Sequence, residues 1–349
     1  MKFYIQQHEF YAGVDLHSNC LHVCVVDAAG EKRLHRNLRT SQLDRLQAEL
    51  LTFSKTSLVV GCESTFNWYW LADWCQEQRI PFILGHALYM KAIHGGKVKN
   101  DAIDSEKIAR LLRGGNFPIA YAYPKELRAT RDLMRRRSLL VRRRAEFLGH
   151  IQIVHYQENL PKPAGNLSYK SNRYGVGATL ADPSSRLSVE VDLQLIDALD
   201  QQIHQLELHL LRTTKAHIPE SFFRLKTIPG AGDILALTML YEIGSIDRFP
   251  TCGDFLSYSR LVKSSHTSNG KKCAATGKSK IGNSYLRWAF GEAALLHKRE
   301  LATAAQFADK VEKKHGKARA LHQLSVKLAR AVYYMLKRNT TFDSCIYER

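Results

Sequence analysis

The segment FYAGVDLHS, residues 10–18, decides the fold of the first part of the chain. Its apolar residues predict a buried β-strand. A carboxylate is unusual in such a strand, so the presence of Asp15 must be explained by a function or a partner. Side chains alternate along a strand, so Val14 and Leu16 point to the face opposite Asp15. A second apolar run, LHVCVVDAAG at 21–30, follows after a few polar residues and ends in a turn-like sequence. The two runs predict neighbouring strands.

Strand and helix patterns alternate through the rest of the first 115 residues. A third strand is compatible with GEKRLHRNLRT at 30–40, and SLVVGCES at 57–64 reads as a buried strand. Helical spacing at 42–53, an aromatic-rich helix at 66–78, a short strand at 81–87 and a helix at 101–115 complete the pattern. Three adjacent strands followed by alternating helix and strand predict an α/β layer with a mixed sheet.

The remaining sequence predicts mainly helices, so we expect three parts. These are an α/β domain over 1–118, a helical, coiled-coil-like arm over 119–217 with a flexible loop near 161–186, and a mostly helical domain over 218–349. The second helix of the arm has apolar residues on an approximate heptad seam that Asp200 interrupts. It can pair with the first arm helix or with a second chain, and the sequence does not choose.

The composition indicates a partner that carries negative charge. The chain has 349 residues, 51 Lys plus Arg against 33 Asp plus Glu, and a formal net charge of +18. Such an excess is typical of nucleic-acid binding. No apolar run approaches the roughly 18 residues of a spanning helix, and the start of the chain has no signal-peptide pattern. We therefore expect a cytoplasmic protein with no membrane partner, whose seven cysteines are reduced thiols.

Four acidic residues are candidates for chemistry. Asp15 lies in a strand, Glu63 closes the strand LVVGCE, and Asp101 and Asp104 lie at i and i+3 in the first turn of a helix. Carboxylates from two strands and one helix suit a nuclease with two magnesium ions, since Mg²⁺ prefers oxygen ligands. Alternatively, Asp101 and Asp104 cap their helix and the other two acids are ordinary. His17 shares the strand face of Asp15.

The C-terminal part has features of a DNA-binding domain. The segment LKTIPGAG at 225–232 lies between two helices and predicts a helix-hairpin-helix, in which the amides at Gly230 and Gly232 approach a phosphate. The alternative is a plain tight turn. A segment rich in Ser, Thr, Lys and Gly follows at 263–287 and predicts a phosphate-binding loop. The predicted nucleic-acid contacts are Lys97, Lys99, Arg135, Arg136, Arg142, Arg143, Gly230, Gly232, Lys271, Lys272, Lys278, Lys280 and Arg287.

Three motifs carry a family resemblance. The segments AGVDLHS, VVGCESTFNWYW and KVKNDAIDSEKIARLL resemble the RuvC-like DEDD domain of the insertion-sequence one-ten transposases, the Piv/MooV-like recombinases, and most of all their eleven-eleven subgroup. The resemblance implies an RNase H/RuvC-like fold. It also implies that Asp15, Glu63, Asp101 and Asp104 bind Mg²⁺, two ions per site.

The resemblance further implies a serine nucleophile in the C-terminal domain. The matching segment is T-S-N-G at 267–270, which selects Ser268, with Thr267, Ser264 and Ser265 as competitors. It implies recombination of donor and target DNA, guidance by a non-coding bridge RNA, and a dimer or a pair of dimers that composes the active site across protomers.

Two other functions stay open from the residues alone. A Holliday-junction-type endonuclease would use the same acids with water as the nucleophile. A non-catalytic nucleic-acid-binding protein would use the acids structurally and bind through the helix-hairpin-helix. The sequence contains no P-loop and no dinucleotide fingerprint, so a reaction driven by ATP or NAD is not indicated.

Overall fold

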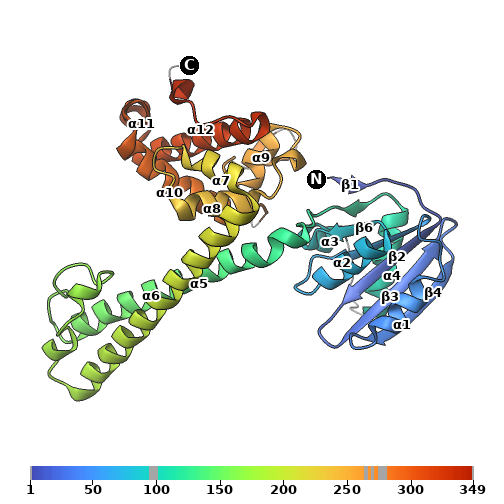
Figure 1. Cartoon of the computed structure of the whole chain (residues 1–349), viewed down its shortest axis with the longest axis horizontal. Coiled ribbons are helices and arrows are strands. Elements are labelled where there is room, and N and C mark those ends of the chain that lie inside the picture. The colour runs from blue at the N-terminus through green and yellow to red at the C-terminus, as the bar shows by residue number, and fades with distance from the viewer. Residues whose placement is uncertain (1, 94–100, 263–265, 269–270, 274–280, 348–349) are drawn as a thin grey trace. The chain divides into compact units, whose positions relative to one another are not determined.

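The computed structural model describes residues 2–93, 101–262, 266–268, 271–273 and 281–347. Of residues 91–93, 101–102, 266–268 and 271–273 it describes the backbone alone. The chain divides into two compact units, Met1–Lys125 and Glu126–Arg349, which are coloured blue to green and green to red in Figure 1. The expected change from an α/β part to a helical part is confirmed. The arm and the C-terminal helices fall in one unit.

The first unit is built on a five-stranded mixed sheet. Its strands are β2 (Phe10–Leu16), β3 (Cys20–Asp27), β4 (Lys32–Arg39), β5 (Leu58–Glu63) and β6 (Phe82–Gly85). The order is β4-β3-β2-β5-β6, with β2, β3 and β4 antiparallel and with β5 and β6 parallel to β2 (Figure 1). This topology is consistent with the RNase H/RuvC-like fold.

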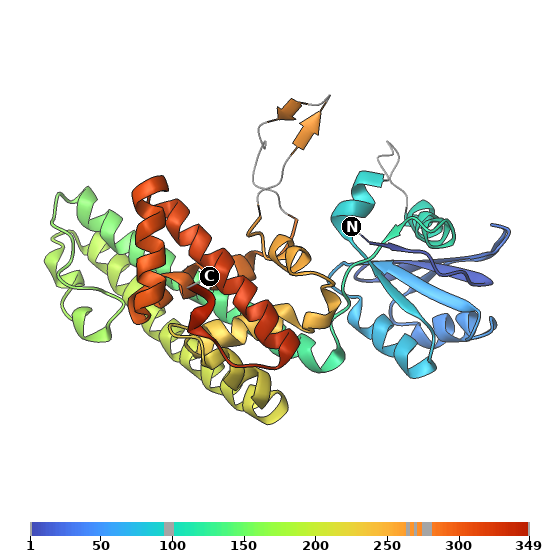
Figure 2. The same ribbon diagram turned by 90° about the horizontal axis from the view of Figure 1, so that it is seen from above.

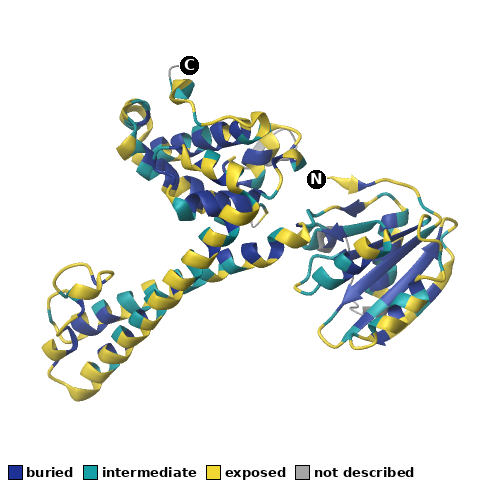
Figure 3. Ribbon diagram, viewed as in Figure 1, coloured by how far each residue is buried: buried dark blue, intermediate teal, exposed yellow. Residues whose placement is uncertain are grey.

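Alternation along the strands gives the sheet two apolar faces. Val14 and Val60 pack in one core with helices α1 (Leu43–Leu50) and α2 (Tyr69–Gln78). Tyr11 and Val59 pack in a second core with α4 (Asp101–Arg113). Both faces are covered, which is why the strands at the centre of the sheet are dark blue in Figure 3. The unit also contains elements that the sequence pattern did not indicate: α3 (Ala87–Ile93), and β1 (Phe3–Tyr4) paired with β7 (Phe117–Pro118).

The arm is a pair of antiparallel helices from one chain, α5 (Lys125–Gln157) and α6 (Pro183–His217) (Figure 1). Two ion pairs, Arg137 with Glu207 and Arg144 with Asp200, and a hydrogen bond between His150 and Asp192 join them. Asp200 thus interrupts the apolar seam because it binds an arginine of the partner helix. In this structure the two arm helices pair with each other within the chain.

The segment between the arm helices, which the composition predicts to be flexible, is packed on the arm. Leu167, Val176 and Leu180 are buried against α5 and α6. The Arg173 guanidinium lies 2.5 Å from Asp197 and 2.5 Å from Asp200. The segment includes the 3-10 helices Lys170–Asn172 and Gly177–Thr179, and Asp182 caps α6 by accepting from the amides of Ser184 and Ser185.

The C-terminal helices surround α8, whose residues from Leu235 to Ile243 are all buried. The elements are α7 (Pro219–Lys226), α8 (Asp233–Ile243), α9 (Cys252–Tyr258), β8 (His266–Ser268), β9 (Lys271–Cys273), α10 (Ser284–Glu300), α11 (Ala302–His315), α12 (Lys317–Arg338) and the 3-10 helices Ile246–Arg248 and Ser344–Tyr347. Helix α10 packs on α8, α11 and α12, as Figure 2 shows for the orange and red helices. The strands β8 and β9 form a two-stranded antiparallel hairpin.

The described cysteines Cys20, Cys24, Cys62, Cys75, Cys252 and Cys345 are all free thiols. Among the helices that the structure describes, none combines the length and the apolar character needed to cross a bilayer.

Candidate active site

Asp15 and Glu63 lie at the carboxyl ends of two neighbouring parallel strands, Asp15 next to last in β2 and Glu63 last in β5. Val14 pairs with Cys62, so the next residues, Asp15 and Glu63, follow at the same edge of the sheet. The alternation that sends Val14 and Cys62 into the core with α1 and α2 sends both acids to the face of α4. Both acids are also close enough to affect the same buried thiol. Burial raises the pKa of the Cys62 thiol, and the charges of Cys75, Glu63 and Asp15 raise it further.

Helix α4 lies in close contact with the same two strands because glycines face it. A Cβ on Gly13 would lie 2.1 Å from the Ser105 carbonyl oxygen, and one on Gly61 would lie 2.7 Å from Cδ1 of Leu112. Any other residue at Gly13 would push the helix away. Ser105 directly follows Asp104, so the contact with Gly13 holds the first turn of α4 above the sheet.

The direction of α4 places its first turn at the edge that carries Asp15. At its other end, Arg113 donates to the carbonyls of Ala28 and Ala29 in the turn between β3 and β4. That turn lies beside the start of β2, because Phe10 pairs with Asp27. The first turn, which contains Asp101 and Asp104, therefore lies toward the end of β2. Asp104 is half-buried and lies 3.1 Å from the Lys107 ammonium.

A small polar network surrounds the end of β2. Nε2 of His17 lies 3.0 Å from Oδ2 of Asp15, a buried residue with 9% of its surface exposed. Asn67 donates through Nδ2 to the His17 carbonyl at 2.9 Å, and the Thr65 hydroxyl donates to Oδ1 of Asn67 at 2.9 Å. The sequence indicates His17 but not Asn67. Asn67 lies four residues after Glu63, in the loop that follows β5, and this position is the signal that could have found it.

The structure describes the side chains of Asp15 and Glu63 on neighbouring strands and that of Asp104 in the first turn of α4. For Asp101 and Ser268 it describes the backbone: Asp101 begins α4, and Ser268 ends β8 opposite Lys271. The backbone of Lys271 and Lys272 lies in β9. The predicted residues Lys97, Lys99, Lys278 and Lys280, and the competing hydroxyls Ser264 and Ser265, lie outside the described residues.

The turn between α7 and α8 is shaped by packing inside the domain. Gly230 has a φ of +83°, and a Cβ there would lie 2.6 Å from the amide nitrogen of His297 in α10. Its N–H donates to the Glu300 carboxylate at 2.5 Å. Gly230 is thus accounted for by its contact with α10, whereas Gly232 is exposed at the start of α8. A helix-hairpin-helix that binds phosphate stays a prediction.

The arginines of α5 divide into internal and external ones. Arg135 and Arg131 bind the buried carboxylate of Glu242, and Arg137 pairs with Glu207 on α6. Arg136 and Arg142 are exposed. Arg143 is also exposed, and its guanidinium lies 2.6 Å from Glu146. In the C-terminal domain, Arg287 is exposed on α10.

A separate group on the α4 side of the sheet has ligand atoms of the kind that bind metals. Cys24, His35 and Glu106 place a sulfur, a ring nitrogen and a carboxylate oxygen within 4.8 Å of one another. However, both oxygens of Glu106 already accept hydrogen bonds, from Lys32 and from Arg110. Burial raises the pKa of Cys24 to about 11, so the thiolate is costly at neutral pH. These contacts favour a structural cluster.

Comparison with known proteins defines the class. Residues 12–154 match a family model described as "Transposase", and residues 223–309 match one described as "Transposase IS116/IS110/IS902 family". The chain is therefore a transposase, an enzyme that cuts and rejoins DNA. It belongs to the IS110 family of insertion-sequence transposases, as its motifs indicated.

Two relatives extend the similarity to nearly the whole chain. The transposase for insertion sequence element IS1111A of Coxiella burnetii (strain RSA 493 / Nine Mile phase I) is 24% identical over 339 residues, which are 95% of this chain and 90% of that protein. The transposase for insertion sequence element IS1328 of Yersinia enterocolitica is 23% identical over 347 residues, 95% of this chain and 98% of that protein. A role limited to non-catalytic binding is set aside by this membership.

Proposed function

We propose that the chain moves an insertion sequence by a serine attack on DNA that the DEDD carboxylates support. The observation that carries this proposal is the meeting of three elements at one sheet edge. Asp15 is the penultimate residue of β2, Glu63 ends β5, and the contact of Ser105 with Gly13 holds the first turn of α4 near that end of the sheet.

The donor set fits a hard divalent cation. Asp15, Glu63, Asp101 and Asp104 offer only carboxylate oxygens, which Mg²⁺ prefers, and we propose that they hold two ions. When bound, the metal would polarise the scissile phosphate and stabilise the leaving oxygen. The chain itself fixes the geometry of these groups: His17 contacts Asp15, and Asn67 holds the backbone of His17.

Ser268 is the proposed nucleophile. Its Oγ forms a bond to phosphorus, the bond from phosphorus to a deoxyribose oxygen breaks, and the serine proton leaves to a base while the departing oxygen gains one. The resulting phosphoserine ester retains the energy of the broken bond. Attack by the hydroxyl of a second DNA end on the same phosphorus then releases the serine and completes the exchange.

The proposed partners are donor and target DNA, a bridge RNA and further copies of the chain, acting in the cytoplasm. The exposed arginines Arg136, Arg142 and Arg143 on α5 and Arg287 on α10 support contact with phosphate backbones. The net charge of +18 supports binding of more nucleic acid than one duplex. RNA guidance and the oligomer follow from the family resemblance.

The test is covalent trapping on element-end DNA with Mg²⁺ and the cognate non-coding RNA. Wild type, Ser268→Ala, Thr267→Ala and Asp104→Asn are compared for cleavage and for a protein–DNA adduct that survives denaturation. We expect an adduct with wild type and Thr267→Ala, and none with Ser268→Ala or Asp104→Asn. Cleavage by Ser268→Ala without an adduct would mean that water attacks, and the endonuclease alternative would replace the serine mechanism.

A further inference from the structure

The two ends of the segment that carries Ser268 are bound to each other. Arg260 donates through Nε to the Ile281 carbonyl at 3.0 Å, and the amide of Asn283 donates to the Tyr258 carbonyl at 2.6 Å. Gly282 has a φ of +91°, and a Cβ there would lie 2.7 Å from the same Tyr258 carbonyl. The chain thus leaves the helical core after α9 and returns to it at α10 through one clamped root, residues 258–262 and 281–283.

Asn283 joins this root to the buried carboxylate of Glu242. Its Oδ1 accepts from the amides of Tyr285 and Leu286 and so caps α10. Its Nδ2 donates to Oε2 of Glu242 at 2.7 Å. Since the side chain uses its oxygen for the helix and its nitrogen for Glu242, its orientation is fixed from both sides.

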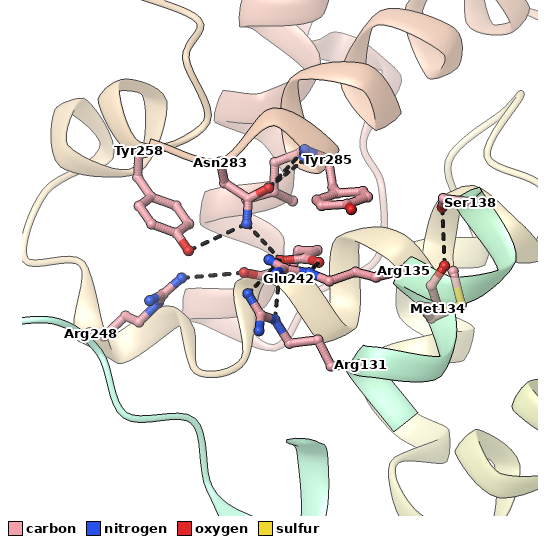
Figure 4. A network of polar contacts seen from close by, with 10 residues as sticks. Arg131, Met134, Arg135, Ser138, Glu242, Arg248, Tyr258, Asn283 and Tyr285 are labelled. Carbon is pink, nitrogen blue, oxygen red and sulfur yellow. Dashed lines mark hydrogen bonds and ion pairs between the residues drawn. The ribbon is translucent and has the colours of Figure 1, made fainter. Parts of the chain in front are cut away.

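Glu242 is in turn bound by the arm. Arg135 donates through Nε and Nη2 to its two oxygens at 2.7 and 2.9 Å, and Nη2 of Arg131 lies 3.0 Å from Oε2. Figure 4 shows Arg131, Arg135 and Asn283 converging on the Glu242 side chain. Only 1% of Glu242 is exposed, so these charged hydrogen bonds are shielded from solvent. A paired guanidinium and carboxylate of this kind has one favoured geometry.

Aromatic contacts extend the cluster along the root. The Arg135 guanidinium lies 4.7 Å from the centre of the Tyr285 ring, in the first turn of α10. The Arg248 guanidinium lies 4.3 Å from the centre of the Tyr258 ring and donates to the Glu242 carbonyl. The end of α9 and the start of α10, which flank the root, are therefore each connected to Glu242 through one or two residues.

We propose that Glu242 and Asn283 are positioning residues for the serine: they fix the root of the segment that carries Ser268 to the arm helix α5. This proposal rests on the proposed function, because it assigns the cluster to the orientation of that nucleophile. Neither residue is a catalytic residue. The cluster holds together the two points at which the chain leaves the helical core after α9 and returns to it at α10.

The experiment separates positioning from folding. Asn283→Ser retains an oxygen that caps α10 but loses the reach to Glu242, and Glu242→Gln retains the size of the side chain but loses its charge. Glu207→Gln is the matched control, because it breaks the Arg137 pair between α5 and α6 and touches no residue of the root. The full-length chain is used, with thermal unfolding measured first so that all assays run on folded protein.

Three readouts are taken for each variant: the rate of adduct formation at saturating element-end DNA, the Kd for that DNA, and hydrogen exchange at the amides of 258–262 and 281–286. We expect Asn283→Ser and Glu242→Gln to lower the adduct rate by about 10- to 100-fold, with Kd within about twofold of wild type. Exchange at the root should rise, and Glu207→Gln should match wild type in all three.

The outcomes distinguish this proposal from the one on which it rests. Faster exchange at the root with an unchanged adduct rate, or unchanged exchange in Asn283→Ser, would overturn the positioning role. If wild type cleaves DNA without an adduct, the serine mechanism itself fails, and with it the assignment of the cluster to the serine. Loss of DNA binding in step with the adduct rate would assign the cluster to DNA binding and would also overturn it.

Discussion

Asp15 and Glu242 are both buried carboxylates, and they are built into the molecule in opposite ways. Asp15 contacts His17, which directly follows β2 and is only two residues away. Glu242 binds Arg131 and Arg135, which are 111 and 107 residues away, and Asn283, which is 41 residues away. One carboxylate is presented by a strand among other acids, and the other is neutralised by arginines.

The different surroundings of the two carboxylates predict that Asp15 supports activity and that Glu242 supports stability. Acids that meet at a sheet edge repel one another, and a bound cation removes this repulsion, so their substitution should affect activity first. A carboxylate between two arginines already has its counter-charges inside the protein, so its substitution should affect stability first.

The largest effect is expected for Asp15→Asn. The amide cannot hold the cation as the carboxylate does, so DNA cleavage should fall by at least about a thousandfold, several kcal/mol of transition-state stabilisation. The thermal midpoint should change little. Asp27→Asn is the control on the neighbouring strand, since Asp27 pairs with Arg33 and lies opposite Phe10, at the other end of β2 from Asp15. A cleavage rate near wild type in Asp15→Asn would remove Asp15 from the site.

Glu242→Ala should have the largest effect on stability. It leaves two arginines without their buried carboxylate, which costs about 3–5 kcal/mol of unfolding free energy. Urea unfolding followed by circular dichroism measures this cost. The matched change Glu207→Ala, at a partly exposed pair with Arg137, should cost less than about 1 kcal/mol. Equal costs for the two variants would contradict the contrast between the sites.

Gly13→Ala tests the contact that places α4. A methyl group there would meet the Ser105 carbonyl and the Ala109 nitrogen, so the helix must move. We expect a loss of about 1–3 kcal/mol in stability and a clear drop in cleavage. Gly149→Ala on α5 is the control, because its Cβ would meet nothing within 4 Å. It should be neutral or stabilising by up to about 1 kcal/mol. Cleavage by Gly13→Ala at the wild-type rate would show that the helix position is not critical.

The pH dependence of stability should report on Glu242. Burial would raise the pKa of this carboxyl, but the hydrogen bond from Arg135 and the charges of Arg131 and Arg135 outweigh burial and hold the pKa below its usual 4.5. The stabilisation is therefore complete above about pH 4.5 and is lost as the pH falls through the lowered pKa. Urea unfolding measures the difference in unfolding free energy between wild type and Glu242→Gln. This difference should be constant above that pH and should become smaller below it. A difference independent of pH would contradict this.

The smallest effect is expected on the exposed side of α5. Arg142→Gln removes one proposed phosphate contact, so the slope of log K against log salt for DNA binding should fall by about 1. Arg137→Gln, which removes an internally paired arginine, should leave the slope unchanged. Binding isotherms at several salt concentrations measure both slopes, and identical slopes would show that the exposed arginines do not contact DNA.

The sequence predicted the first unit better than the cluster around Glu242. Strand alternation and the positions of Asp15 and Glu63 are local patterns, and the mixed sheet with helices on both faces confirms them. Helix α3 and the β1–β7 pair escaped prediction because they are short, and β1 and β7 pair across most of the unit. The need for glycine at position 13 follows only from the packed structure, in which α4 approaches β2 closely.

The cluster could not be predicted because its partners are far apart in sequence. The arginine triplets of α5 indicate a surface for phosphate, and nothing local distinguishes Arg135, which binds Glu242, from the exposed Arg136. Glu242 lies within an apolar helix and was a visible anomaly, since a buried carboxylate needs a partner. Its partners become known only when α5, α8 and α10 are packed together.

The proposal that Ser268 attacks DNA is tested most directly by locating the DNA on the protein. The adduct formed by wild type with Mg²⁺, guide RNA and element-end DNA is digested with nuclease and trypsin, and the modified peptide is sequenced by mass spectrometry. We expect a nucleotide joined through phosphate to the hydroxyl of Ser268. A nucleotide on another residue, or cleaved DNA with no modified peptide at all, would contradict it.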